Sequence, residues 1–155
     1  MISGNSNGKY HNAVGMYFIK NFQKTNGVKQ YQYKSKLEKA MMSYLDKTPN
    51  VLQWKYEPTS IDYIDMTEKN PQTGRFGKPR KYYIDFIATV LESSGKVRNV
   101  WIEIKSSKET KQPSDSSSLE RKKTWIRNNC KWSAAKRLCE SKGYKFLVIT
   151  DKDLS

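Results

Sequence analysis

Two carboxylates and one lysine in the middle of this 155-residue chain have the types and spacing best suited to catalysis. The predicted strand over 100–105 (VWIEIK) alternates, so Glu103 and Lys105 share the face opposite its aliphatic residues. Asp85 lies in the preceding predicted strand, over 81–90, and Gly95 marks a turn that would join the two strands as a hairpin. Facing Cβ atoms in a hairpin are about 4.5–5.5 Å apart, so we expect the three side chains to form one patch.

Two acids beside a lysine could hold a divalent cation and activate water for hydrolysis. Asp85 and Glu103 would supply carboxylate ligands, and the backbone carbonyl of Ile104 could add another. Lys105 would orient or deprotonate the attacking water, or stabilise the charge that develops on a phosphorane. The charged, solvent-facing side of an ordinary antiparallel hairpin explains the same residues equally well. The hairpin by itself therefore leaves both interpretations open.

Glu38 is a further acid with two possible tasks. Ser35 and Glu38 form a Ser-x-x-Glu capping box at the start of a predicted helix that leads to Leu45. Glu38 also shares a stripe with Met41 and Leu45, so its carboxylate points along an apolar face toward the expected sheet. A carboxylate drawn toward a core needs a partner, and a metal ion is one. Local sequence favours the capping box.

The composition narrows the chemistry. The chain has 29 Lys and Arg against 15 Asp and Glu, a net charge of +14, which favours a polyanionic partner such as nucleic acid. His11 is the only histidine, and Cys130 and Cys139 match no metal-ligand spacing. Structural zinc, a Ser/His/Asp triad and a Cys/His dyad are therefore disfavoured. No apolar run approaches the roughly 20 residues of a membrane-spanning helix, so we expect no membrane partner.

The order of predicted elements indicates an α/β fold. A helix near 35–45 is followed by strands over 51–57 and 59–66, the hairpin, a helix over 119–142 and a strand over 145–150. Residues 67–80 hold two Pro and two Gly and are predicted to form a loop or hairpin tip. We expect a single domain over 31–155 with a mixed central β-sheet flanked by helices, its last strand parallel to a neighbour. Residues 1–30 are predicted to form an N-terminal arm, with at most a short helix near 14–22.

The long helix carries a basic stripe. Lys123, Arg127 and Lys131 step by four, which suits contact with a DNA backbone, although a solvated lysine-rich face has the same pattern. The net charge favours DNA contact. We also predict DNA contacts for Lys34, Lys36 and Lys108. Glu109 is close in sequence to the expected site, but nothing local makes it a ligand.

Asp85 followed by Glu103-Ile104-Lys105 resembles the motif of the PD-(D/E)xK nuclease superfamily. Many chains contain Glu-x-Lys, and the surrounding segments narrow the resemblance. Over about 31–154 the chain is similar to the head-completion nucleases of tailed phages, relatives of the TnsA-type endonucleases. The segments that carry this similarity, in order, are YKSKLE (33–38), VLQWKYEP (51–58), RKYYIDF (80–86), VWIEIK (100–105), KWSAAKRLCESKGYKFLVIT (131–150) and DKDL (151–154).

The resemblance implies a restriction-endonuclease-like core and Mg²⁺-dependent DNA cleavage, with Mn²⁺ able to substitute and no small-molecule cofactor. It implies that Glu38 joins Asp85, Glu103 and Lys105 in the site. It also implies a role in closing the filled phage head, with DNA and phage portal or neck proteins as partners. The expected locations are the cytoplasm of the infected host cell and the virion head or neck.

The chain departs from the family pattern in places, and other functions stay open. Lys34 and Leu37 stand where the family usually has Arg and Trp, Ile84 replaces the proline before the motif aspartate, and Ser106 replaces one after Glu-x-Lys. None of these changes removes a catalytic group. The alternatives are a Holliday-junction resolvase, a TnsA-like transposition endonuclease, or a phage neck or head protein that binds DNA without cutting it.

Overall fold

The computed structural model describes residues 13–154. Helices and strands follow in the order β1 (Gly15–Phe18), 3₁₀ helix η1 (Phe22–Thr25), β2 (Gln30–Tyr33), α1 (Lys36–Lys47), β3 (Val51–Tyr56), β4 (Ser60–Lys69), β5 (Phe76–Tyr83), β6 (Phe86–Leu91), β7 (Val97–Ile104), 3₁₀ helix η2 (Ser107–Thr110), α2 (Leu119–Lys142) and β8 (Lys145–Ile149).

The central sheet has the strand order β3-β6-β7-β8. β3, β6 and β7 pair antiparallel, and β7 pairs parallel with β8. The predicted hairpin is confirmed as β6 and β7, with Gly95 in its turn at φ 86°, a conformation that glycine adopts without strain. α2 connects β7 to the parallel strand β8, as expected of a crossover helix. The expected mixed sheet flanked by helices, consistent with a restriction-endonuclease-like fold, is therefore confirmed.

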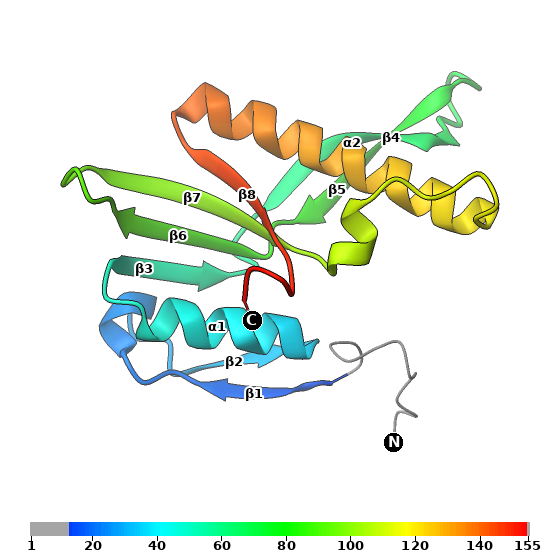
Figure 1. Cartoon of the computed structure of the whole chain (residues 1–155). Coiled ribbons are helices and arrows are strands. Elements are labelled where there is room, and N and C mark those ends of the chain that lie inside the picture. The colour runs from blue at the N-terminus through cyan, green and yellow to red at the C-terminus, as the bar shows by residue number, and fades with distance from the viewer. Residues whose placement is uncertain (1–12, 155) are drawn as a thin grey trace.

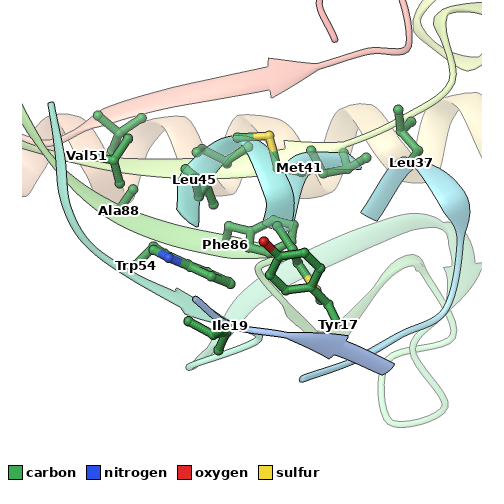
Figure 2. Packing of buried hydrophobic residues seen from close by; sticks show 13 residues of the cluster. Tyr17, Ile19, Leu37, Met41, Leu45, Val51, Trp54, Phe86 and Ala88 are labelled. Atoms are coloured by element: carbon green, nitrogen blue, oxygen red, sulfur yellow. The ribbon is translucent and has the colours of Figure 1, made fainter. Parts of the chain in front are cut away.

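One helix lies on each face of the central sheet, and each helix packs with a two-stranded hairpin (Figure 1). α1 and the β1–β2 hairpin lie on one face, where Trp54 and Phe86 pack beneath Met41 and Leu45 (Figure 2). α2 and the β4–β5 hairpin lie on the other face. β7 contributes to both sides because its residues alternate: Val100, Ile102 and Ile104 join the α1-side cluster, and Trp101 joins the α2-side cluster.

The prediction of one continuous strand over 81–90 was wrong, because the chain changes sheets at Ile84 and Asp85. The Ile84 N–H still bonds to Thr59 O at 3.2 Å, as part of the β4–β5 hairpin. One residue later, Asp85 O accepts from Glu57 N–H at 2.8 Å, next to the central sheet. Ile84 is buried on the α2 side and Phe86 on the α1 side, so the two do not share a face. Asp85 therefore sits at the junction of the two sheets.

The β4–β5 hairpin is longer than predicted. Strand pairing continues into the region expected to be a loop, from Ser60 paired with Tyr83 out to Lys69 paired with Phe76. Pro79 lies inside β5 and is tolerated because neither strand of a two-stranded ribbon is flanked on both sides. The hairpin lies against α2, as Figure 1 shows.

A buried carboxylate fastens this hairpin to α2. Asp65 is completely buried on the inner face of β4, which it shares with the buried residues Ile61 and Tyr63. Its Oδ2 atom lies 3.0 Å from Nε of Arg127 on α2 and 3.2 Å from Nε of Arg80 on β5. Burying a charge is costly unless it is paired, so this contact fixes how the hairpin sits on the helix.

The described part of the predicted N-terminal arm packs on the domain. It forms β1 and η1 in place of a short helix near 14–22, and Tyr17 and Ile19 are in the α1-side core. Buried Asp46 of α1 holds it there, accepting from the Tyr17 hydroxyl at 2.7 Å and Lys20 N–H at 2.8 Å. Residues 1–12, including His11, lie outside the described residues, so the division at residue 30 stays a prediction.

Candidate active site

The four residues predicted to be catalytic line one pocket of about 230 Å³. Glu38 comes from the first turn of α1, Asp85 from the junction before β6, and Glu103 and Lys105 from the end of β7. The remaining lining residues are Lys34, Ser35, Leu37, Ile104, Ser106 and Glu109. Segments far apart in the sequence thus meet where β6 and β7 separate.

The Asp85 carboxylate accepts a hydrogen bond from β7 at the position where backbone pairing with β6 has ended. Pairing between β6 and β7 ends at Phe86 and Ile102. The next N–H on that edge of β7 belongs to Ile104, and it donates to Asp85 Oδ2 at 2.7 Å. In a strand the N–H and C=O of one residue point to the same side, so the Ile104 carbonyl leaves β7 toward Asp85 as well. The contact fixes the orientation of Asp85 relative to β7.

Glu103 carries an unsatisfied buried oxygen. Glu103 is only 7% exposed, and its Oε2 atom has no hydrogen-bond partner among the described residues. Burial raises the pKa of Glu103, and the nearby charge of Asp85 raises it further. Burial also raises the pKa of Asp85, and Glu38 adds to this effect, while the Ile104 N–H opposes it. Crowded negative charge of this kind is relieved by a bound cation or a proton.

Glu38 performs the predicted cap and also borders the pocket. Ser35 Oγ accepts from the Glu38 N–H at 3.1 Å, so Ser35 is the N-cap of α1 as expected. The Glu38 carboxylate reaches back one residue further than in a standard capping box, to the Lys34 N–H at 2.6 Å. Its other oxygen accepts from the Tyr56 hydroxyl at 3.0 Å. Both oxygens are therefore held while the carboxylate faces the site.

The segment after Lys105 is anchored to the end of β8. Lys105 N–H donates to Ile149 O at 3.0 Å, and Ser107 N–H donates to Asp151 Oδ1 at 2.7 Å. This places Glu109 at the pocket, where it accepts from Ser106 Oγ at 3.1 Å. Sequence reasoning noted that Glu109 is close in sequence but gave it no role, and it missed Tyr56, because only the folding of η2 and the pairing of β3 bring them to the site.

Comparison with known proteins identifies the family. The family described as TnsA-like endonuclease N terminal matches residues 48–151, which include Asp85, Glu103 and Lys105. This chain belongs to the TnsA-like endonucleases. It is also 33% identical over 150 residues to the head completion nuclease of Enterobacteria phage T4, across 90% of this chain and 92% of that protein. The resemblance drawn from the sequence is confirmed, and a nuclease that acts on DNA is the activity that the family supports.

The six basic residues predicted to contact DNA have different surroundings in this TnsA-like endonuclease. Lys34 borders the pocket with its Nζ 2.7 Å from Glu57 Oε1, and Lys36 and Lys108 are exposed nearby in sequence. On α2, Lys123 and Lys131 are half-buried, and Arg127 is occupied by Asp65. DNA contact by all six residues, Lys34, Lys36, Lys108, Lys123, Arg127 and Lys131, stays a prediction.

The acidic residues of this endonuclease fit a small, hard divalent cation. Carboxylates and a backbone carbonyl are oxygen donors, and the unpartnered Oε2 of Glu103 is a buried acceptor that a cation would satisfy. Within residues 13–154, no group of three or more His, Cys, Asp or Glu is arranged to hold a metal ion. Mg²⁺ is commonly held by one or two carboxylates and keeps several waters, so the pair Asp85 and Glu103 is sufficient.

No helix of the described residues is long and apolar enough to cross a membrane.

Proposed function

We propose that this chain is an Mg²⁺-dependent DNA endonuclease whose site consists of Glu38, Asp85, Glu103 and Lys105, with Mn²⁺ able to replace Mg²⁺. The observation that carries the proposal is the convergence of buried acids, one with an unpartnered oxygen, and a lysine in a single pocket. A charged, solvent-facing hairpin would leave Glu103 exposed, whereas it is 7% exposed.

Each residue has a role that its contacts support. Asp85, Glu103 and the Ile104 carbonyl would hold the cation, and Glu38 lines the same pocket. A cation held there would supply Lewis-acid chemistry, polarising a phosphoryl oxygen and lowering the pKa of a water molecule. Lys105 lines the same pocket and orients the attacking water or stabilises charge on the phosphoryl group. The Ile104 N–H keeps one oxygen of Asp85 fixed during these steps.

Cleavage of supercoiled plasmid DNA tests the proposal. We expect cutting with MgCl₂ and none with EDTA, and loss of cutting in Lys105→Ala, Asp85→Ala and Asp85→Asn. Asp85→Asn keeps an oxygen that can accept from Ile104 N–H, so it separates loss of the carboxylate from loss of the backbone contact. Equal cutting by the wild type and Lys105→Ala would overturn the mechanism.

We further propose that the cleavage serves completion of a phage head after DNA packaging, with a portal or neck protein as neighbour, in the infected cell and in the virion head. The support is the 33% identity to a protein described as a head completion nuclease. Phage lacking this chain should accumulate filled heads without tails, and the wild-type gene should restore tailed particles. Normal particles without the chain would contradict this role.

A resolvase or a transposition endonuclease of the same superfamily would behave differently in solution. Resolvases commonly act as dimers on branched DNA. The solution mass of the protein and a comparison of linear with four-way branched DNA substrates separate these functions. A dimer that cuts only branched DNA would favour the resolvase and contradict the proposed head role.

A further inference from the structure

Lys131 of α2 is held in a position that a DNA-contacting lysine does not need. Its side chain is half-buried, with Nζ 5.9 Å from the ring centroid of Tyr63 and 5.7 Å from that of Tyr82. The Tyr82 hydroxyl donates to the backbone carbonyl of Lys131 at 3.1 Å. Both tyrosines belong to the β4–β5 hairpin, so this hairpin fixes the ammonium group from one side through its aromatic faces.

The direction of α2 brings Lys131 toward Glu103. α2 connects two parallel strands and therefore runs opposite to β7. Trp101 and Ala135 belong to one buried cluster between β7 and α2. Two residues along a strand span about 6.6 Å and one helical turn spans about 5.4 Å. A step from Trp101 to Glu103 therefore runs in the same direction as a step of about one turn from Ala135 to Lys131.

The charges of Lys131 on α2 and Glu103 on β7 act on each other. Burial and Asp85 raise the pKa of Glu103, while the charges of Lys105 and Lys131 lower it. Burial and the charge of Lys105 lower the pKa of Lys131, and Glu103 opposes this effect. Lys131 is not among the residues that line the pocket. Glu103 shares the α2-facing side of β7 with Trp101 by strand alternation, so the charge of Lys131 acts on Glu103 from the α2 side.

We propose that Lys131 is a positioning residue whose charge orients the Glu103 carboxylate from the α2 side, and that the β4–β5 hairpin serves to fix Lys131. The inference rests on the proposed function, since it assigns Glu103 to a cation site. Its physical basis is that groups behind a metal ligand set the ligand's orientation and affinity. The β4–β5 hairpin, which is anchored to α2 through Asp65, would then contribute to catalysis by fixing Lys131.

Three variants on α2 test this role. Lys131→Met removes the charge and keeps most of the length, Lys131→Arg keeps the charge, and Lys136→Met removes a charge from the exposed side of the same helix. The readouts are kcat and KM for DNA cleavage, Mn²⁺ binding to the protein alone by calorimetry, and melting temperature. For Lys131→Met we expect kcat and Mn²⁺ affinity to fall roughly tenfold or more, with KM for DNA unchanged. Lys131→Arg should recover most of both, and Lys136→Met should match the wild type.

Other results would overturn the inference. A higher KM with unchanged kcat and Mn²⁺ affinity would make Lys131 a DNA contact. A lower melting temperature with unchanged kcat would make its role structural, and tighter Mn²⁺ binding would mean that it only repels cations. If the wild type does not cut DNA, the proposed function fails, but weaker Mn²⁺ binding by Lys131→Met would still support the positioning role.

Discussion

At the scale of single residues, the site combines groups that the sequence indicates with groups that only folding adds. Strand alternation was sufficient to predict that Glu103 and Lys105 share a face, and the turn at Gly95 brought Asp85 near them. Tyr56 carries no local signal, and the basic stripe that includes Lys131 predicted a DNA contact and not a place near Glu103, because both residues come from elements that fold against the site. Glu38 lies between these cases: its cap was predictable, and its contact with Tyr56 was not.

Glu38→Gln separates its structural task from catalysis. Glutamine keeps one oxygen for the Lys34 N–H, and its amide can donate to the Tyr56 hydroxyl, so the loss of unfolding free energy should stay below about 1 kcal/mol. We expect cleavage to fall roughly tenfold or more if the carboxylate serves the cation. Chemical denaturation and the plasmid assay measure the two effects. Glu38→Ala is the control and should lose about 1–2 kcal/mol because both contacts disappear. Full cleavage by Glu38→Gln would leave Glu38 with the cap alone.

At the scale of elements, the predictable parts were those with local periodicity and stop signals. α1 begins at the predicted N-cap Ser35, and α2 ends at Gly143, which has φ 74°. The break at Ile84 was not predictable, because KYYIDF alternates without Gly or Pro and reads as one strand. The extension of β4 and β5 was missed for the opposite reason, since Pro79 and Gly77 indicate a loop. Pairing of the two strands with each other overrides that signal.

The attachment of β1 and η1 to α1 should weaken at acidic pH. Burial raises the pKa of Asp46, but hydrogen bonds from Lys20 N–H, Tyr17 and Asn21 outweigh it, so the pKa lies below its ordinary value of 3.8. A carboxylate whose pKa is lowered by folding stabilises the folded state at pH values above its ordinary, unfolded-state pKa. This contribution is lost as the pH falls through the folded-state pKa. For Asp46→Asn we expect a loss of about 1–3 kcal/mol at neutral pH and a smaller further loss on acidification than in the wild type. Urea denaturation across this pH range measures both.

Other acids, including Asp65, also have a pKa below the ordinary value and contribute to acid unfolding. The informative quantity is therefore the difference between wild type and Asp46→Asn at each pH. Parallel stability profiles for the two proteins would show that Asp46 contributes nothing specific to acid sensitivity. Tyr17→Phe is a matched control, because it removes the 2.7 Å hydrogen bond and leaves the carboxylate in place.

At the scale of the whole molecule, net charge and layer arrangement have separate consequences. The charge of +14 was readable from the sequence and favours DNA at long range. The net charge does not say which basic residues contact the DNA backbone, because Lys34 and Arg127 already form ion pairs with Glu57 and Asp65. The helices that flank the sheet were predicted, but the packing of a two-stranded hairpin against each helix was not (Figure 1).

DNA binding in EDTA should weaken steeply with salt, because each neutralised phosphate releases counterions. For Lys36→Ala and Lys108→Ala, both at exposed positions, we expect the slope of log affinity against log salt to become shallower by about 1 each. Fluorescence anisotropy with labelled duplex DNA at several KCl concentrations gives the slopes, and Lys136→Met is the control. Slopes equal to that of the control would remove these two lysines from the DNA interface.

The hydrogen bond between Asp85 and β7 limits what this carboxylate can offer to an ion. Oδ2 already accepts from the Ile104 N–H at 2.7 Å, so binding through both oxygens would compete with this hydrogen bond, and binding through Oδ1 alone would leave it intact. Mg²⁺ accepts single oxygens in a small octahedral shell, whereas Ca²⁺ is larger and often takes both oxygens of a carboxylate. If the proposed cation site is correct, this backbone amide would favour small cations, and Ca²⁺ should compete poorly with Mg²⁺ in a binding titration.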